Sequence, residues 1–315
     1  MYSLLTYSDG DDARPGLLID GRVCDLELAL EAHVGGKPDG ITFPIDSVIA
    51  VLGAWEVAEP VISAFAREYI ADRPVGGRAF ERSLSRVRLL SPVLYPSAIY
   101  CAAVNYVDHL REVQGKEPPD KATTRPFFFL KTPRQSVIGP DEAIRLPATS
   151  SKVDWEAELG VVIGRPAYRV SRADAMSYVA GYTIVNDLSA RDRGKRSDWE
   201  LGMDWFGAKC FDTSAPIGPW ITPASAIADP HALSIQLWVN DQLQQDSSTA
   251  CMHFTIPELI AYASEQITLK PGDVIATGTP AGTGNRRGIY LKPNDIVTIT
   301  IEGIGTLSNP VVAGA

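Results

Sequence analysis

VDWEAELGVVIG, at residues 153–164, alternates acidic and apolar side chains and then becomes almost entirely apolar. Successive side chains of a β-strand point to opposite faces, so Asp154, Glu156 and Glu158 are predicted to lie on one face of a strand. Such a run of acids either faces solvent, where the repulsion between them is small, or surrounds a cation. This segment therefore predicts an apolar strand that carries a cluster of carboxylates.

A further acid, Asp187, ends the apolar run YTIVND at residues 182–187. Side chains at strand ends often bind ligands, so Asp187 shifts the interpretation toward a metal site. The ligands would be oxygen atoms alone, which suits Mg²⁺, with Mn²⁺ or Ca²⁺ as substitutes, better than Zn²⁺. A solvated acidic face stays the alternative, because acids two residues apart also arise by chance.

Short β-rich runs separated by Gly, Pro, Asn and Asp dominate the chain from about residue 93 onward. They are AIYCAAVNY (98–106), RPFFFLK (125–131), AELGVVIG (157–164), YTIVNDL (182–188), SIQLWVN (234–240), DVIATG (273–278) and IVTITIEGIG (296–305). Only a few of the intervening segments, including 171–181 and 256–266, show a helical period. Strands that outnumber helices without regular alternation predict an α+β, β-rich fold with a rolled or barrel-like mixed sheet.

The first 92 residues are predicted to form a small accessory domain. Two short strand patterns, at 3–7 and 16–26, precede a helical pattern at 47–70. Prolines at 92 and 96 place a boundary near residue 93, so that 93–315 would be the catalytic domain.

Charge and composition argue against several classes of protein. The chain of 315 residues has a formal net charge of −9, which disfavours binding to nucleic acid. Its four cysteines are widely spaced, so they predict reduced thiols and neither a disulfide framework nor a cysteine-rich zinc site. No apolar run reaches the length of a membrane span, and the N-terminus lacks a signal-peptide pattern. We expect a cytoplasmic enzyme that does not bind membranes.

His109 and Glu112 lie three residues apart in AAVNYVDHLREV, residues 102–113. On a helix they would be neighbours, and Glu112 could orient the imidazole as a general base. A surface ion pair is the alternative for any single pair with this spacing. The Pro- and Gly-rich segment that follows suggests a mobile lid, with Gly115 and Pro118 as pivots.

Three further features could bind an anion. Lys209 is flanked by aromatic and small residues, where its ammonium could meet a bound carboxylate. Arg191 follows Asp187 by four residues and would either pair with a substrate acid or brace the metal-binding carboxylates. The turn ATGTPAGTG, residues 276–284, has glycines that would let its backbone amides approach an anion, although it matches no nucleotide-binding loop.

These segments, taken in order, resemble the fumarylacetoacetate hydrolase family over about two-thirds of the chain. The matching stretches are NYVDH (105–109), FFFLKTP (127–133), DWEAELGVVIG (154–164), NDLSARD (186–192), GAKCFD with APIGP (207–219) and GDVIATGTPAG (272–282). The resemblance implies a β-rich roll of the catalytic-domain type and a homodimer.

Carried over by position, the resemblance implies roles for individual residues. Glu156, Glu158 and Asp187 would bind the metal, while His109 and Glu112 would activate water. Lys209 would act in catalysis, and the substrate would contact Arg191, Thr279, Tyr106 and Lys131. The family's additional aspartate ligand has no counterpart around Ala102, which implies three protein ligands.

The leading hypothesis is hydrolysis of a C–C bond in an acylpyruvate-like 2,4-dioxo acid, to give pyruvate or a related 2-oxo acid and a carboxylic acid. His109 would deprotonate water, and the metal and Lys209 would stabilise the enolate. Oxaloacetate decarboxylation, 2-oxo acid tautomerisation and sugar-acid dehydration stay open as alternatives. Four aromatic residues either line the substrate pocket or belong to the core. They are Trp205, Phe206, Phe211 and Trp220.

Overall fold

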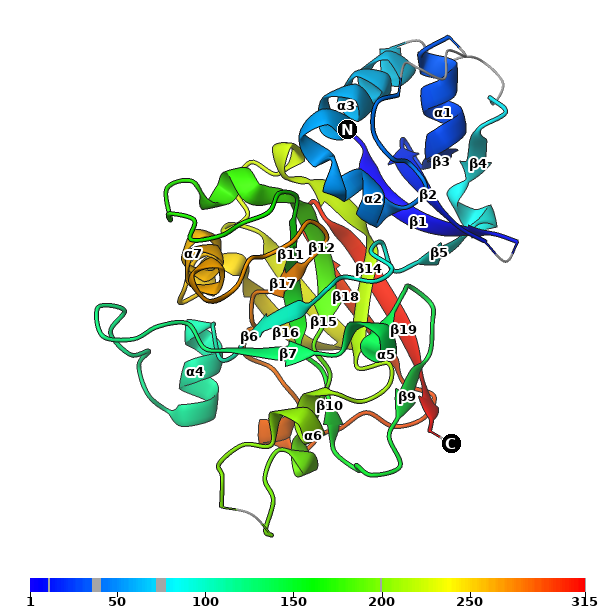
Figure 1. Cartoon of the computed structure of the whole chain (residues 1–315). Coiled ribbons are helices and arrows are strands. Elements are labelled where there is room, and N and C mark those ends of the chain that lie inside the picture. The colour runs from blue at the N-terminus through cyan, green and yellow to red at the C-terminus, as the bar shows by residue number, and fades with distance from the viewer. Residues whose placement is uncertain (11, 36–40, 72–77, 199, 315) are drawn as a thin grey trace.

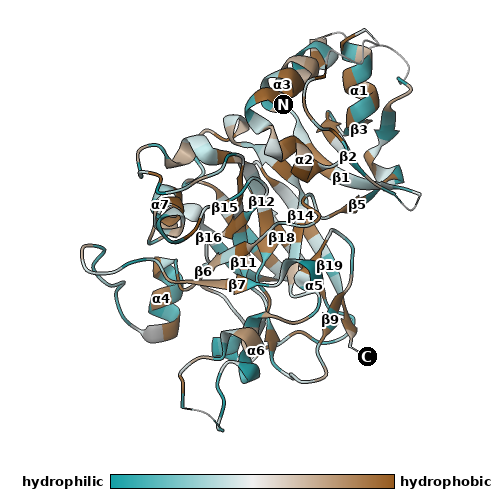
Figure 2. Ribbon diagram, in the orientation of Figure 1, coloured by the Kyte–Doolittle hydropathy of each residue, from teal (hydrophilic) through white to brown (hydrophobic). Residues whose placement is uncertain are grey.

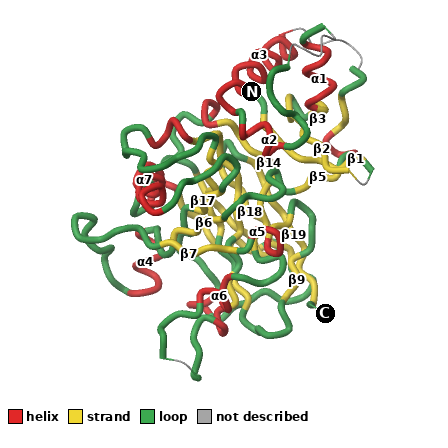
Figure 3. The backbone as a smooth tube through the Cα atoms, viewed as in Figure 1, coloured by secondary structure: helices red, strands yellow, loops and turns green. Residues whose placement is uncertain are grey.

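The computed structural model describes residues 1–10, 12–35, 41–71, 78–198 and 200–314. Within them the fold is α+β and rich in strands, which confirms the predicted class (Figure 1). The strands gather in the middle of the molecule and most helices lie at its periphery (Figure 3). No described helix has the length and apolar character that crossing a bilayer would require.

The largest sheet has twelve strands. Ten of them form a continuous path, in the order β4 (Glu81–Ser83), β3 (Arg22–Asp25), β2 (Asp12–Ile19), β1 (Ser3–Asp9), β14 (Ala215–Pro223), β12 (Val179–Asn186), β11 (Ala157–Ile163), β17 (Val274–Ala276), β6 (Ile99–Ala102) and β7 (Phe128–Lys131). The other two are β5 (Arg88–Leu90), beside β1, and β8 (Val137–Ile138), beside β14. Because β17 and β6 are parallel while β11 and β12 are antiparallel, the sheet is mixed.

A second sheet has five strands, and a third has two. The five-stranded order is β16 (Gln242–Ser248), β15 (Ser234–Val239), β18 (Ile296–Ile301), β19 (Gly305–Ala313) and β9 (Ile144–Leu146). The two-stranded ladder pairs β10 (Val153–Asp154) with β13 (Ser189–Ala190). These described strands form open sheets rather than a closed barrel.

Strand β11 shows why the middle of the molecule is so apolar: all seven of its residues are buried. Its alternate residues Leu159 and Val161 pack in the core that includes the five-stranded sheet. The next residue, Val162, points to the opposite face and belongs to the core that includes the N-terminal helices. A strand covered on both faces reads as a nearly continuous hydrophobic run, and the hydropathy colouring shows this in the central strands (Figure 2).

The N-terminal layer contains the expected strands and helices. Residues 3–7 fall within β1, and residues 16–26 contain the end of β2, the turn at Asp20 and Gly21, and β3. The helical pattern at 47–70 becomes two helices that meet at Ala54. Leu4 of β1 pairs with Ile221 of β14, so this layer extends the catalytic sheet. Its helices are α1 (Leu26–His33), α2 (Val48–Gly53) and α3 (Trp55–Ala71). The domain boundary near residue 93 stays a prediction.

The remaining helices are short and surround the ends of the strands. They are α4 (Val107–Gln114), α5 (Pro133–Ser136), α6 (Trp205–Lys209) and α7 (Ile256–Gln266). Helix α7 matches the helical pattern at 256–266. It begins with a capping box between Thr255 and Glu258, which satisfies backbone N–H groups of the first turn. All four cysteines are free, as the sequence predicted.

Two local predictions are wrong. The segment 171–181 is not an α-helix but a short 3₁₀ turn, Ala175–Tyr178, which leads directly into β12. The strand expected over 153–164 is interrupted at Trp155 and Glu156, between β10 and β11. In both places, tertiary packing overrides a local periodic pattern.

Candidate metal centre and active site

Glu156, Glu158 and Asp187 converge, with one carboxylate oxygen from each lying within 4.8 Å of the others. Adjacent strands bring them together, because Ala157 of β11 pairs with Asn186 of β12. All three side chains belong to buried residues, with exposed fractions of 6%, 2% and 1%. This burial excludes the alternative of a solvated acidic face and leaves a cluster that could hold a metal ion.

The electrostatics of the cluster fit a divalent cation. Burial, followed by the charges of Asp187 and Glu156, raises the pKa of Glu158 well above its ordinary value. Burial also pushes the pKa of Glu156 upward, but Lys209 and Arg191 outweigh it and keep that pKa below its usual range. Three buried carboxylates with oxygen ligands alone match the preference of Mg²⁺, Mn²⁺ or Ca²⁺. A bound cation would relieve the repulsion that Glu158 experiences.

Two buried lysines hold the carboxylates in place. The Nζ atom of Lys209 lies 2.6 Å from Glu156 Oε2 and 2.8 Å from Asp187 Oδ2. The Nζ atom of Lys131 lies 2.6 Å from the other oxygen of Asp187 and donates to the carbonyl of Leu188. Burial lowers the pKa of Lys209, but the neighbouring carboxylates reverse that effect and keep it charged. Both ammonium groups are therefore at the metal cluster, where a bound oxo acid could meet them.

Arg191 also contacts the cluster rather than solvent. Its Nε donates to Asp154 at 2.8 Å and its Nη2 donates to Glu156 at 2.6 Å. Of the two roles that the sequence left open for Arg191, the structure shows the bracing one. Asp154 does not join the triad, because it also accepts hydrogen bonds from the amides of Gly284 and Asn285. Contact between Arg191 and substrate stays a prediction.

The predicted dyad forms on helix α4. His109 Nδ1 lies 3.3 Å from Glu112 Oε2, and His109 is only 6% exposed, so the pair is not a surface ion pair. Burial raises the pKa of Glu112, but the hydrogen bonds from His109 and the Gly282 amide outweigh it and hold that pKa below its usual range. Gly115 ends the helix in a left-handed conformation.

The glycine-rich turn binds the protein's own acids. The amides of Gly278, Gly282 and Gly284 donate to Glu158, Glu112 and Asp154 respectively. These three amides are therefore used by the protein's own carboxylates, and binding of a ligand anion by the turn stays a prediction. Gly278 and Gly282 have φ values of +95° and +102°, which other residues rarely adopt. The turn instead connects the dyad to the carboxylate cluster.

Thr279 and Tyr106 are both buried, so little of either side chain is accessible from outside the protein. Thr279 is 3% exposed, and its hydroxyl donates to the carbonyl of Ala157 and accepts from Gln245. Tyr106 is fully buried, and its hydroxyl has no hydrogen-bond partner among the described residues. Their role as substrate contacts stays a prediction.

Two buried residues that support the candidate site were not predicted from the sequence. Gln245 is fully buried on β16, where it accepts from the Ala157 amide and donates to Thr279 and to the carbonyl of Pro280. It stands in the polar run QLQQD, which gives no sign of burial. Asn105 ties Phe254 to the glycine-rich turn through three hydrogen bonds. A polar residue inside the apolar run AAVNY was the available signal for Asn105.

The four aromatic residues that could line the pocket or belong to the core do not all have the same environment. Trp205 lines a cavity and stacks on Phe129 at a centroid distance of 4.8 Å, whereas Phe206 is 71% exposed. Phe211 packs against the main core, and Trp220 packs against the smaller apolar cluster around β1. Trp205 therefore fits the pocket alternative, while Phe211 and Trp220 fit the core alternative.

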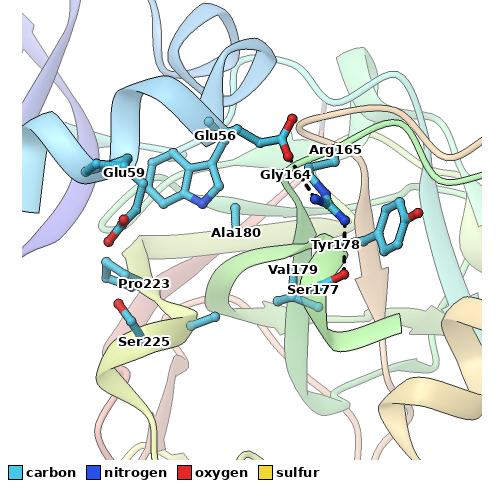
Figure 4. A pocket seen from close by; sticks show the side chains of 13 residues that line it. Glu56, Glu59, Gly164, Arg165, Ser177, Tyr178, Val179, Ala180, Pro223 and Ser225 are labelled. Atoms are coloured by element: carbon cyan, nitrogen blue, oxygen red, sulfur yellow. Dashed lines mark hydrogen bonds and ion pairs between the residues drawn. The ribbon is translucent and has the colours of Figure 1, made fainter. Parts of the chain in front are cut away.

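A separate cavity of about 250 Å³ lies where α3 meets the ends of β12 and β14 (Figure 4). Arg165 spans it by pairing with Glu56 at 2.8 Å and donating to Ser177 at 3.0 Å. Neither the carboxylate cluster nor the dyad lines this cavity. It belongs to the junction of the N-terminal layer with the catalytic sheet.

Comparison with known proteins agrees with this geometry. The family model for the fumarylacetoacetate (FAA) hydrolase C-terminal domain matches residues 98–312. The chain belongs to the fumarylacetoacetate hydrolase family. A match of this extent covers every member of the triad and the dyad, and the family assignment agrees with the resemblance inferred from the sequence motifs.

Similar proteins within the fumarylacetoacetate hydrolase family are named for different reactions. The chain is 42% identical to a mitochondrial oxaloacetate tautomerase from Xenopus laevis, over 73% of this chain and 70% of that protein. A maleylpyruvate hydrolase from Sphingobium sp. SYK-6 has a TM-score of 0.74 and 32% identity, covering 99% of this chain and 100% of that chain. That hydrolase has also been solved in complex with manganese(II) ion and pyruvate.

Proposed function

We propose that this protein catalyses metal-dependent enolisation of a 2-oxo acid, with keto–enol interconversion of oxaloacetate as its leading reaction. The observation that carries the proposal is the His109–Glu112 dyad, whose imidazole is buried and which the glycine-rich turn links to three convergent carboxylates. The similarity to oxaloacetate tautomerases, at 38–42% identity for two of them, supports this reaction. We propose Mg²⁺ or Mn²⁺ as the metal.

The protein's own groups account for the proton transfer. A divalent cation held by Glu156, Glu158 and Asp187 would supply Lewis acidity toward the oxygens of the 2-oxo acid. His109 removes or returns the proton at the carbon next to the oxo group, and Glu112 orients the imidazole. A positioned base of this kind contributes about 10²–10⁴-fold. The ammonium of Lys209 stabilises negative charge that develops on the oxo oxygen.

A second reaction, hydrolysis of an acylpyruvate, uses the same groups. His109 would take a proton from water, the resulting hydroxide would attack the distal carbonyl, and the C–C bond would break to release a pyruvate enolate and a carboxylic acid. The likeness to a maleylpyruvate hydrolase over 99% of the chain favours this candidate. The sequence alone ranked it first, because a dyad suits activation of water.

The test is to incubate metal-stripped protein with oxaloacetate and a panel of acylpyruvates, with and without Mg²⁺ or Mn²⁺, and to identify the products. Metal-dependent equilibration of enol and keto oxaloacetate without loss of CO₂ supports the tautomerase. Metal-dependent release of pyruvate and a carboxylic acid from an acylpyruvate supports the hydrolase. The proposal fails if neither substrate reacts faster with the metal-loaded protein than with metal alone.

A further inference from the structure

Strand β16 carries two polar side chains on the face that packs toward the core. Gln245 and Ser247 are two residues apart, so they point to the same side of the strand. They lie opposite Leu237 and Ile235 of β15, which belong to the main core. Polar groups on such a face are costly unless they form hydrogen bonds. Each of the two side chains therefore requires a specific partner.

Gln245 joins the metal-binding strand to the glycine-rich turn. Its Oε1 accepts from the amide of Ala157 at 3.0 Å, and Ala157 stands between the two glutamates of the triad. Its Nε2 donates to the hydroxyl of Thr279 at 2.9 Å and to the carbonyl of Pro280 at 2.8 Å. The side chain is fully buried, so these hydrogen bonds hold β11 and the turn at a fixed separation.

Ser247 joins the same strand to the helix that carries the dyad. Its hydroxyl donates to Asp108 Oδ2 at 2.6 Å. The other carboxylate oxygen of Asp108 accepts from the amide of His109 at 2.8 Å, in the first turn of α4. A negative charge at the start of a helix is favoured by the helix dipole. Through Asp108, the serine therefore fixes the start of the helix that presents the imidazole.

The backbone of β16 also lies against the glycine-rich turn. A Cβ atom added to Gly282 would lie 2.1 Å from the carbonyl oxygen of Gln244. The amide of Gly282 donates to Glu112, the second member of the dyad. One strand thus contacts the metal-binding strand, the turn and the dyad helix, which lie far apart in the sequence.

We propose that Gln245 and Ser247 are positioning residues that set the distance between the metal centre and the imidazole of His109. A base must meet a substrate held by the metal at a fixed distance, and a displacement of about 1 Å can lower the rate about 10²-fold. Gln245 fixes the metal side of this distance, and Ser247 fixes the side of the base. This inference rests on the proposed function, which makes His109 the base.

Ser247→Ala tests the side of the base without changing a metal ligand. Because the variant loses the hydroxyl that holds Asp108, we expect kcat for oxaloacetate interconversion to fall about tenfold and Mn²⁺ affinity to stay within about twofold of wild type. Ser247→Thr keeps a hydroxyl and should restore kcat. The matched control is Asp246→Asn, an exposed substitution on the opposite face of β16, which should change neither quantity. An unchanged kcat in Ser247→Ala overturns the assignment.

A double-mutant cycle shows whether Ser247 acts through His109. Ser247→Ala should lower kcat about tenfold in the wild-type background. In the His109→Ala background it should have no effect on kcat, because no base is left to misplace. Equal losses in the two backgrounds would contradict the positioning role and indicate a general loss of structure.

Hydrogen exchange of backbone amides, followed by mass spectrometry, tests the same contacts without turnover. Exchange in α4 should be about tenfold faster in Ser247→Ala than in wild type, and unchanged in Asp246→Asn. Gln245→Met keeps the length of the side chain but loses its hydrogen bonds, so it should speed exchange in residues 276–284 and weaken Mn²⁺ binding about tenfold.

Unchanged exchange in α4 of Ser247→Ala, or unchanged Mn²⁺ affinity in Gln245→Met, overturns the inference. The proposed function fails separately: if these changes occur but the metal-loaded protein turns over no oxo acid, β16 still fixes the two parts of the site and only the assigned reaction is contradicted.

Discussion

Glu158 is the residue on which the metal site depends most. Its carboxylate lies on β11, is 2% exposed and accepts from the amide of Gly278 at 2.7 Å. A charged group in that position needs a cation, because burial and two neighbouring acids raise its pKa. The uncharged amide of glutamine can keep the hydrogen bond from Gly278 without that requirement.

We therefore expect Glu158→Gln to weaken Mn²⁺ binding by more than about tenfold while leaving the metal-free protein folded. Calorimetric titration gives the affinity, and circular dichroism checks the fold. Glu265→Gln, an exposed substitution on α7, serves as the control and should bind metal normally. Unchanged Mn²⁺ affinity in Glu158→Gln would exclude this carboxylate as a ligand.

The effect of His109 on turnover should be separable from metal binding. His109→Ala removes the proposed base but none of the three carboxylates, so we expect Mn²⁺ affinity within about twofold of wild type and turnover lower by about 10²–10⁴-fold. Glu112→Gln should lower the rate less, because the imidazole stays in place. Steady-state kinetics with saturating Mn²⁺ provide the measurement. Turnover that survives in His109→Ala would refute the role of the dyad.

The triad was predictable because two simple rules place it. The spacing of two residues keeps Glu156 close to Glu158 even though Glu156 lies just before β11, and the end of β12 places Asp187 beside them. The sequence could not show that Lys131 and Lys209 contact these acids, because a lysine side chain is long and its direction depends on packing. Nor could it show that backbone amides would divert Asp154.

At the scale of elements, the glycine-rich turn couples the dyad helix to the strands of the metal centre. Gly282 donates to Glu112, and Gly278 donates to Glu158. A Cβ atom on Gly282 would lie 2.1 Å from the carbonyl oxygen of Gln244, in addition to a φ of +102°. The close approach to β16, rather than an anion, is therefore what requires glycine there.

Gly282→Ala should lower the free energy of unfolding by about 1–3 kcal/mol or more. It should also reduce turnover, because the turn must shift away from β16. Gly288→Ala is a matched control, since Gly288 has a φ of +68° but no atom within 4 Å of the added Cβ. Gly288→Ala should lower the free energy of unfolding by about 1 kcal/mol, the strain of a left-handed backbone conformation alone. Equal effects of the two substitutions in chemical denaturation would contradict a steric requirement at Gly282.

Most elements were predictable from local pattern, and the exceptions have tertiary causes. Helix α7 carries its own start signals, so 256–266 was predicted correctly. The segment 171–181 has a helical period, but β12 begins within it at Val179 and pairs with β11 and β14. The buried role of Gln245 depends on β11 and the glycine-rich turn, which lie far away in the sequence.

At the scale of the whole molecule, the N-terminal layer and the catalytic sheet share one apolar core. Leu17 and Ile62 from the N-terminal layer belong to the same buried cluster as Val162 and Ile217 from the catalytic sheet. Local strand and helix patterns, with the prolines at 92 and 96, predicted a small accessory domain, and this boundary stays a prediction. The joint core could not be inferred without the pairing of β1 with β14.

We expect a chain restricted to residues 93–315 to lack a cooperative thermal transition, because one side of the catalytic sheet would lose its apolar cover. The full chain should unfold in a single calorimetric transition. A stable 93–315 fragment with its own sharp transition would show instead that the N-terminal layer is dispensable for folding.

In the proposed reaction, a metal ion and His109 together move a proton at the carbon beside the oxo group. Exchange of the C3 protons of oxaloacetate in D₂O, followed by NMR with metal-stripped and Mn²⁺-loaded protein, tests it most directly. We expect exchange above the uncatalysed rate only with Mn²⁺, and a fall of about 10²–10⁴-fold in His109→Ala. Exchange that is independent of both the metal and His109 would contradict it.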